Sequence, residues 1–251
     1  MALLTTPAIV LGCIPLGEAD KLVTFFTVKK GKLKGVAKGA RRMKSRYGAT
    51  LEAFTHCDLI VFEKGGDKLS RVNQTDSVHS FQNLRENWDN ISLASRMVDL
   101  VSRMTPDEEP NVAIFKLLLQ GLTFLESGQD RTLFMVHFAS RLISLCGYQP
   151  CWDNCLKCHV PFKAGTRLTL FFSSSAGGAI CSRCASGMKF LIEISQGTRA
   201  FLSASQKMDY HLSHRLKPSS LIKKETEGLF KAYLGYITGK VDMYLPRKKA
   251  V

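Results

Sequence analysis

Residues 22–46 read LVTFFTVKKGKLKGVAKGARRMKSR, an apolar run followed by a cluster of basic residues. Between Asp20 and Glu52 the chain has ten Lys or Arg residues and no acid. Within Lys32–Gly39 lysines alternate with small or apolar residues, and this period of two predicts a β-strand with its lysines on the outer face. Because like charges repel, a cluster placed inside a folded element favours a negatively charged partner.

The partner that best fits this cluster is a phosphate backbone, since Lys and Arg release condensed counterions when they bind one. The alternative is a solvated basic surface that keeps the protein in solution. The net charge of +14 is unevenly distributed along the 251 residues. Residues 1–80 carry +6, residues 81–150 carry −2 and residues 151–251 carry +10. Two basic flanks around a near-neutral middle favour nucleic acid held on selected faces.

Five short strands are expected in the first 80 residues, separated by glycine-rich or charged breaks. They are Ala8–Leu16, Leu22–Lys29, Lys32–Gly39, Leu51–Lys64 and Leu69–Phe81. Gly65-Gly66-Asp67 predicts a turn between the last two strands. Five short strands in a segment of this length favour a small closed barrel, with the OB-fold as the leading candidate.

Beyond the strands, apolar residues recur at intervals of three and four, a spacing typical of amphipathic helices. The first predicted helix ends before Pro106, and Asn111 and Asp130 are the expected N-caps of the next two. A last helix is expected from Ser220 to Gly239. The strands followed by helices predict an α+β chain of more than one domain.

Two CxxC pairs, Cys155-Leu-Lys-Cys158 and Cys181-Ser-Arg-Cys184, are separated by 22 residues. Each CxxC turn places two sulfurs on one side of a tight loop, and two such knuckles supply a tetrahedral shell of four thiolates for zinc. With no open position on the metal, the one expected zinc per chain is structural. A redox pair and unliganded thiols are the alternatives.

Other cysteines and one histidine have simpler interpretations. Cys151 and His159 are spare ligands for a distorted site, but Cys151 packed beside Trp152 and His159 on the knuckle surface are favoured. Three cysteines in apolar surroundings are expected to act as buried small hydrophobic residues: Cys13, Cys57 and Cys146. The predicted organisation is an OB-fold at 1–80, then a helical domain at 81–251 with a zinc ribbon inserted at about 151–188.

Several functional classes have no support in the sequence. It has no phosphate-binding GxxxxGK[ST] loop, no HExxH or GxSxG motif and no kinase signature, so no enzymatic activity is expected. The acids of Asp107–Glu109 are interpreted as a solvated linker rather than a nuclease metal site. No apolar stretch of about 18 residues is present, so no membrane span is expected, and the chain is expected in the cytoplasm.

The chain resembles the bacterial DNA repair and recombination family RecO over nearly its whole length. The motifs that carry the resemblance are Gly17-Glu18-Ala19-Asp20, the strand to Val28, residues 31–42, Lys44-Ser-Arg46, Leu51–Phe54, Phe138 with Gly147-Tyr148-Gln149-Pro150, Phe172-Ser173 and Gly177-Gly178. It implies an N-terminal OB-fold and a helical domain bearing the ribbon. The cysteine tetrad is not universal in that family, which also favours a structural metal.

The resemblance further implies a non-enzymatic recombination mediator of the RecF pathway, associated with the nucleoid. Similar proteins bind single- and double-stranded DNA, anneal complementary strands without ATP, and help load RecA with RecR on strands coated by single-stranded DNA-binding protein (SSB). The basic residues that match the family's DNA-contacting stretch, with Lys32 from the same strand, are the candidate contacts: Lys32, Lys34, Lys38, Arg41, Arg42, Lys44 and Arg46. The candidates for binding the acidic C-terminal tail of SSB are Lys223 and Lys224.

Annealing requires strands whose charge is neutralised while their bases stay free to pair. The basic segment fits this need, because Lys29–Arg46 contains no aromatic residue and only Tyr47, just outside, could stack on a base. Two rival interpretations are a sequence-specific zinc-ribbon transcription or RNA-processing factor, and an enzyme that acts on nucleic acid through a free cysteine or an unrecognised metal site.

Overall fold

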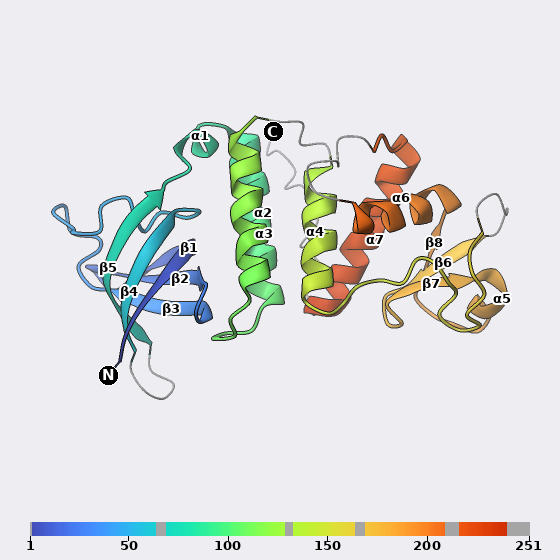
Figure 1. The fold of residues 1–251 in the computed structure, drawn as a ribbon, viewed down its shortest axis with the longest axis horizontal. Helices are drawn as coiled ribbons and strands as arrows, with labels where there is room; N and C mark the ends of the chain where they lie inside the picture. Colours follow the sequence, from blue (N-terminus) through green and yellow to red (C-terminus); the bar gives the residue numbers. More distant parts are fainter. Residues whose placement is uncertain (1, 64–68, 129–132, 164–168, 209–215, 240–251) are drawn as a thin grey trace. The chain divides into compact units, whose positions relative to one another are not determined.

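The computed structural model describes residues 2–63, 69–128, 133–163, 169–208 and 216–239. The chain forms two compact units, Met1–Gln129 and Asp130–Val251 (Figure 1). The helices between the barrel strands and Gln129 therefore belong to the same compact unit as the barrel. Whether residues 1–80 and 81–251 are the folding domains stays a prediction.

The first unit contains a closed barrel of five strands in the order β1-β2-β3-β5-β4, with β4 paired back to β1. Neighbouring strands are antiparallel except β3 and β5, which meet in parallel at Gly35↔Ser70 and Val36↔Arg71. The strands are β1 Ala2–Leu16, β2 Asp20–Thr27, β3 Gly31–Ala37, β4 His56–Glu63 and β5 Ser70–His79. This barrel confirms the predicted OB-fold.

Alternation of buried and outward side chains along β3 explains how the basic strand joins the barrel. Leu33 and Ala37 are buried while Lys34 is exposed, as the period of two predicted. At Gly35 a Cβ atom would lie 2.9 Å from Val72 Cγ2, so glycine lets β3 and β5 approach closely enough to close the barrel. The barrel core contains Ala8, Val10, Val23, Phe25, Leu33, Ala37, Tyr47, Leu51, Cys57, Leu59, Val61 and Val72.

Two strands differ from their predicted bounds by more than two residues. β1 begins at Ala2 rather than Ala8, because residues 2–9 pair with β4. β4 begins at His56 rather than Leu51, because the preceding residues form successive turns whose backbone N–H groups bond to carbonyls three residues earlier. The predicted Gly65-Gly66-Asp67 turn lies outside the described residues.

Three helices complete the described part of the first unit: α1 Gln82–Arg85, α2 Trp88–Met104 and α3 Val112–Glu126. The predicted single helix is divided at Asn87, whose side chain accepts a hydrogen bond from Asn90 N and so caps α2. Asn111 caps α3 in the same way, accepting from Ile114 N at 3.0 Å, as predicted.

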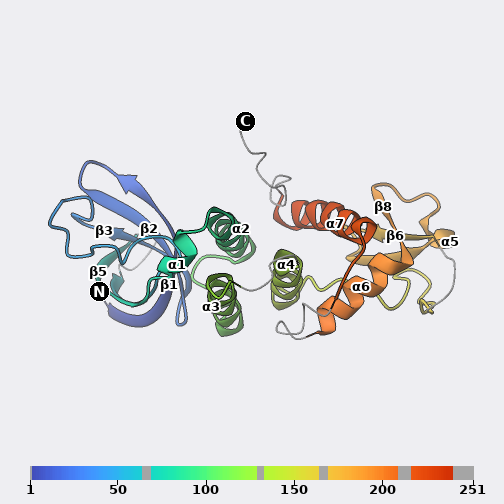
Figure 2. The same ribbon diagram turned by 90° about the horizontal axis from the view of Figure 1, so that it is seen from above.

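Within the described residues, the second unit contains four helices (Figure 2) and a small antiparallel sheet of order β7-β6-β8 (Figure 1). Its elements are α4 Phe134–Leu145, β6 Leu170–Ser173, β7 Gly178–Cys181, α5 Ser182–Ala185, β8 Leu191–Ile194, α6 Gln196–Lys207 and α7 Ser220–Thr238. Gly147 follows α4 and Gly239 ends α7, both in left-handed conformations, and Gly239 is where the last helix was predicted to end. The predicted cap Asp130 lies outside the described residues.

Aromatic packing links the small sheet to the helices of the second unit. The Trp152 ring stacks on Phe172 of β6 with centroids 5.2 Å apart, and Phe172 meets Tyr233 of α7 edge to face at 5.2 Å. The Tyr233 hydroxyl donates to Tyr148 O at 2.7 Å. On α6, Arg199 Nη1 donates to Trp152 O at 3.1 Å. These contacts fix the cysteine-bearing segment to the helices.

Candidate nucleic-acid interface and metal centre

The basic residues after β3 form a folded loop beside the β1–β2 turn. We call residues 38–46 the basic loop. Its first turns are closed by hydrogen bonds from Arg42 N to Gly39 O at 3.2 Å and from Ser45 N to Arg42 O at 3.0 Å. Gly39 N donates to Asp20 Oδ1 at 2.8 Å, and Arg41 N donates to Ala19 O at 2.9 Å. The loop thus lies at an edge of the barrel where OB-folds bind oligonucleotides.

Tyr47 anchors the C-terminal end of the basic loop. Its ring is 2% exposed and its hydroxyl donates to Val72 O at 2.9 Å. The Arg46 guanidinium lies over this ring, 5.0 Å from the centroid. The expectation that Tyr47 could stack on a base is therefore wrong, because the ring is part of the barrel core.

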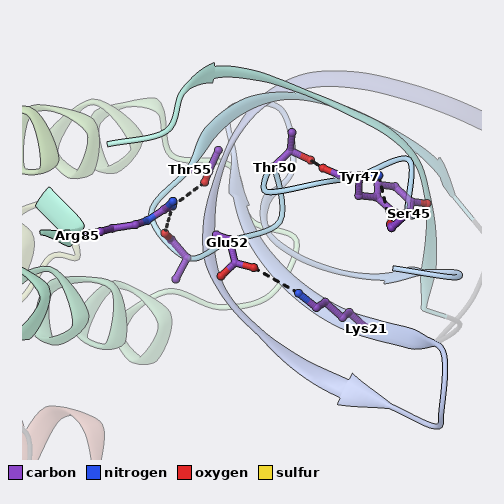
Figure 3. A network of polar contacts seen from close by, with 8 residues as sticks. Lys21, Ser45, Tyr47, Thr50, Glu52, Thr55 and Arg85 are labelled. Carbon is purple, nitrogen blue, oxygen red and sulfur yellow. Dashed lines mark hydrogen bonds and ion pairs between the residues drawn. The ribbon is translucent and has the colours of Figure 1, made fainter. Parts of the chain in front are cut away.

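Residues 47–55 are held to the barrel and to α1 by further side chains (Figure 3). Thr50 Oγ1 donates to Tyr47 O at 2.6 Å. Lys21 Nζ lies 3.4 Å from Glu52 Oε1, and Arg85 Nη2 donates to Ala53 O at 2.7 Å and to Thr55 Oγ1 at 2.9 Å. The basic loop therefore projects from a braced support, so its cations are displayed without disturbing the core.

The cations differ in how free their side chains are. Lys38, Arg42 and Lys44 are exposed, and among the described residues their side chains have no hydrogen bond or ion pair. Arg41 Nη1 donates to Gly17 O at 2.9 Å, and Arg46 Nη2 donates to Tyr47 Oη at 2.9 Å. Three of the predicted contacts are thus free for a phosphate, and two also brace the loop.

Lys32, a predicted phosphate contact, makes its bonds inside the first unit. Its ammonium donates to Ser102 O and Thr105 O, both at 2.6 Å, and lies 3.1 Å from Asp107 Oδ1. Its side chain is only 12% exposed, so its three donors are used inside the unit. Lys32 therefore satisfies carbonyls at the C-terminal end of α2, and we leave it out of the proposed contact set.

The acidic loop between α2 and α3 lies against β3. Glu108 N donates to Lys32 O at 2.9 Å, and Asp107 Oδ2 lies 3.3 Å from Lys34 Nζ. Burial acts to raise the pKa of Asp107, but hydrogen bonds from Lys32 and Lys34 outweigh it and lower the pKa. These acids are thus more than a solvated linker. Since 73 residues separate Lys34 from Asp107, no local pattern could have predicted the pair.

The four predicted cysteine ligands come together in the second unit. Their sulfur atoms all lie within 4.8 Å of one another, and the Cys158 and Cys181 sulfurs are 3.8 Å apart. Cys155 and Cys158 lie in a loop before β6, Cys181 ends β7 and Cys184 lies in α5. This cluster could hold a metal ion, which confirms the predicted convergence of the two knuckles.

The spare ligands stay outside the cluster. Cys151 extends the sheet: its N–H donates to Gly177 O and its carbonyl accepts from Ala179 N. A Cβ atom at Gly178 would lie 2.6 Å from Cys151 O, so glycine permits this close approach. His159 is exposed on the first knuckle, as favoured, and its N–H donates to Cys155 O at 2.8 Å.

The chemistry of the cluster suits a soft divalent cation. Burial acts to raise the pKa of Cys155, but backbone N–H donors of Cys158, Cys181 and Lys157 outweigh it and lower that pKa to about 6. Side-chain hydrogen bonds with Cys181 and Cys158 raise the pKa of Cys184 to about 12. Four ionised sulfurs at this spacing repel one another, so a cation is needed to hold all four as thiolates.

The remaining cysteines are not equally buried. Cys57 is fully buried in the barrel, and burial raises its pKa to about 12, which confirms the expected inert role. Cys13 and Cys146 are only half-buried, so the expectation of full burial is wrong for them. Burial still raises the pKa of Cys146 to about 11.

Comparison with known proteins agrees with this fold. Residues 1–81 match the family described as Recombination protein O N terminal, and residues 85–242 match Recombination protein O C terminal. The chain belongs to the RecO family. The DNA repair protein RecO of Thermoanaerobacter sp. strain X514 is 31% identical over 236 residues, 93% of this chain and 92% of the relative. That of Thermodesulfovibrio yellowstonii is 32% identical over 94% of this chain and 93% of the relative.

Membership of the RecO family makes the chain a DNA repair and recombination protein. Nothing in the fold or the comparisons favours a sequence-specific transcription factor. Among the described helices, none is long and apolar enough to cross a membrane.

Proposed function

We propose that the chain is a non-enzymatic recombination mediator that binds single- and double-stranded DNA without sequence preference and anneals complementary strands without a nucleotide. The observation that supports this most is the basic loop, which displays the free side chains of Lys38, Arg42 and Lys44 beside the β1–β2 turn of an OB barrel. Phosphate contacts of this kind carry no sequence information.

The loop suits annealing because it neutralises backbones and leaves bases free. The aromatic residue that directly follows the loop, Tyr47, is buried in the core, so its ring does not compete for the bases of a bound strand. Arg41 and Arg46 add positive charge while each holds an internal hydrogen bond. Lys34 shares its charge with Asp107, so we expect it to contribute less than the three free cations.

We assign zinc to the four-cysteine cluster, with a structural role. When bound, the ion would be held by Cys155, Cys158, Cys181 and Cys184 and would neutralise their thiolates. All four sites of a tetrahedral ion are then filled by sulfur, so no position is left for a substrate. The cysteines themselves join the loop before β6 to β7 and α5, and so fix the ribbon.

The partners we propose are RecR and SSB, with the protein helping to load RecA on SSB-coated strands in the RecF pathway. Family membership supports these partners. Lys223 and Lys224, exposed at the start of α7, are the candidates for binding the acidic tail of SSB. The proposed location is the cytoplasm, in association with the nucleoid.

The test is annealing of two complementary oligonucleotides, bare or pre-coated with SSB, in the absence of nucleotide. We expect the protein to accelerate pairing of both, with the same yield for unrelated sequences and with the oligonucleotides chemically unchanged on a denaturing gel. A strong preference for one sequence would instead support the transcription or RNA-processing factor. Covalent change to the strands would support an enzyme.

A further inference from the structure

Phe190 combines two unfavourable features in the zinc ribbon. It precedes β8 directly and has a φ of 58°, in the left-handed region that aromatic residues avoid. Its side chain is 94% exposed. A tight turn, closed by Met188 N donating to Ala185 O at 3.0 Å, leads into this position. The chain therefore holds an apolar ring in water on a strained backbone.

Other residues with positive φ show what normally offsets such strain. Phe54 and Phe81 have φ values of 76° and 52°, but their side chains are 6% and 1% exposed, so burial of the ring compensates. Glu108 and His159 each donate a backbone hydrogen bond in a turn, to Lys32 O and Cys155 O. Phe190 has no comparable burial, which makes a functional role the better explanation of its geometry.

The ribbon that carries Phe190 also carries exposed cations. Lys189 is adjacent, Lys157 lies in the first knuckle and Arg183 in the second, and all three are exposed. Within the described part of the chain, none of the three is in ion-pair distance of an acid. Of the ribbon's acids, Asp153 is paired with Lys207 at 2.9 Å and Glu193 lies further along β8.

Strand pairing shows how far the backbone of Phe190 lies from the second knuckle. Leu191, next to Phe190, pairs with Ser173, which pairs with Gly178, three residues before Cys181. Cys181 is level with Ile194 across the sheet, so Phe190 lies four residue rises from that level. Two strand spacings of about 4.8 Å and four residue rises of about 3.3 Å give about 16 Å between the backbones of Phe190 and Cys181. A few nucleotides of an extended strand could thus reach both the ring and the cations of the knuckles.

We propose that the zinc ribbon is a second site for single-stranded nucleic acid, in which Phe190 stacks on a base and Lys189, Lys157 and Arg183 contact phosphates. An exposed ring beside cations is the combination that binds single strands, and stacking tolerates any sequence because every base has a π-face. The site rests on the proposed function and extends it: the basic loop holds phosphates only, whereas the ribbon also holds a base.

The test compares variants of the full chain for binding of a labelled mixed-sequence single strand across a salt series. We expect Phe190→Ala to weaken binding about 5- to 150-fold, the range for loss of one stacked base. Its salt slope should stay unchanged, because stacking releases no counterions. Lys189→Ala should flatten the slope by about 0.7. Phe190→Trp should bind normally, with its indole fluorescence quenched by the strand in a Trp88→Phe background.

Two controls separate stacking from folding and from simple apolar contact. Phe190→Gly should lose binding like the Ala variant while its melting temperature rises, because glycine tolerates the left-handed backbone. Phe190→Leu should also lose binding, since it keeps apolar area but has no π-face. Normal binding by the Leu variant would refute the stacking role, and normal binding by the Ala and Gly variants would refute the site.

The outcome also distinguishes this site from the proposed function. If the wild-type chain binds no single strand, the proposed function and the ribbon site both fail. If the wild type binds, and replacement of Lys38, Arg42 and Lys44 weakens binding while Phe190→Ala does not, only the ribbon site fails. Loss of a protein partner by Phe190→Ala, with normal strand binding, would overturn the site in favour of a protein interface.

Discussion

Lys32→Met should destabilise the first unit far more than Lys34→Met, although the two lysines lie two residues apart on the outward face of β3. The Lys32 ammonium donates to Ser102 O and Thr105 O at 2.6 Å and pairs with Asp107 at 3.1 Å. Methionine keeps most of the apolar stem and removes only the charge and its three donors. The prediction therefore isolates the cap on the C-terminal end of α2.

The expected magnitude follows from burial and from the number of lost bonds. Hydrogen bonds that involve a charged group contribute about 1.5–3 kcal/mol each, but water can reach part of the opened carbonyls, so we expect a loss of about 3 kcal/mol. The side chain of Lys34 is 46% exposed, and its single ion pair should contribute no more than about 1 kcal/mol. For a unit of this size, a loss of 3 kcal/mol lowers the melting temperature by roughly 10 °C.

Hydrogen exchange read by mass spectrometry is the suitable assay, because it reports the two units separately. Peptides from β3 and α2 should lose protection in Lys32→Met, while peptides from α4 and α7 serve as an internal control and should not change. Equal protection in Lys32→Met and Lys34→Met would refute the capping role. So would a stable Lys32→Met chain whose only defect is a flatter salt dependence of DNA binding, since that would make Lys32 a phosphate contact.

Three further predictions concern the metal and the pH dependence of stability. Metal analysis should find about one zinc per chain. Cys158→Ser should lose the zinc and lower the melting temperature of the second unit, while single-strand binding by the basic loop is kept. A chain that is prepared without chelator and contains no zinc would contradict the metal assignment. His137 lies in α4 and is buried, and this burial lowers its pKa to about 4, so the folded state keeps it neutral. The free energy of unfolding should therefore be complete above about pH 6.5 and fall by about 2 kcal/mol by pH 5, a loss that His137→Leu should not show in a urea series. Burial acts to raise the pKa of Asp107, but its two lysine partners outweigh burial and lower the pKa. The contribution of Asp107 to the free energy of unfolding is therefore present above about pH 4 and is lost as the pH falls through the lowered pKa. An acid titration in which Asp107→Asn matches the wild type would refute this contribution.

The features that could be predicted from sequence are those written in local patterns. Alternation along β3 placed Leu33 and Ala37 inward, and five such strands are enough to indicate the barrel. The CxxC spacing predicted which sulfurs meet, because each pair is brought together within its own turn. Asn111 was recognisable as a cap because the bond it accepts comes from three residues away.

Features that depend on distant contacts could not be predicted. Lys32 and Lys34 have the same local sequence pattern. Only the approach of residues 102–107 makes Lys32 a cap on α2 and leaves Lys34 in an exposed ion pair with Asp107. Tyr47 follows a basic, polar segment, yet its ring fills the barrel because its hydroxyl reaches Val72 O. The exposure of Phe190 likewise depends on the left-handed backbone after the Ala185–Met188 turn, which its sequence does not indicate.

The most direct test of the central claim is the salt dependence of single-strand binding by Lys38→Ala/Arg42→Ala/Lys44→Ala. These three exposed side chains make no hydrogen bond or ion pair with described residues, so the melting temperature should be unchanged. Loss of three phosphate contacts should flatten the slope of log affinity against log salt by about 2, at roughly 0.7 per contact. The control Arg103→Ala/Lys116→Ala removes exposed cations of α2 and α3 and should leave the slope unchanged. Parallel lines for the triple variant and the wild type would show that the basic loop is not the DNA site.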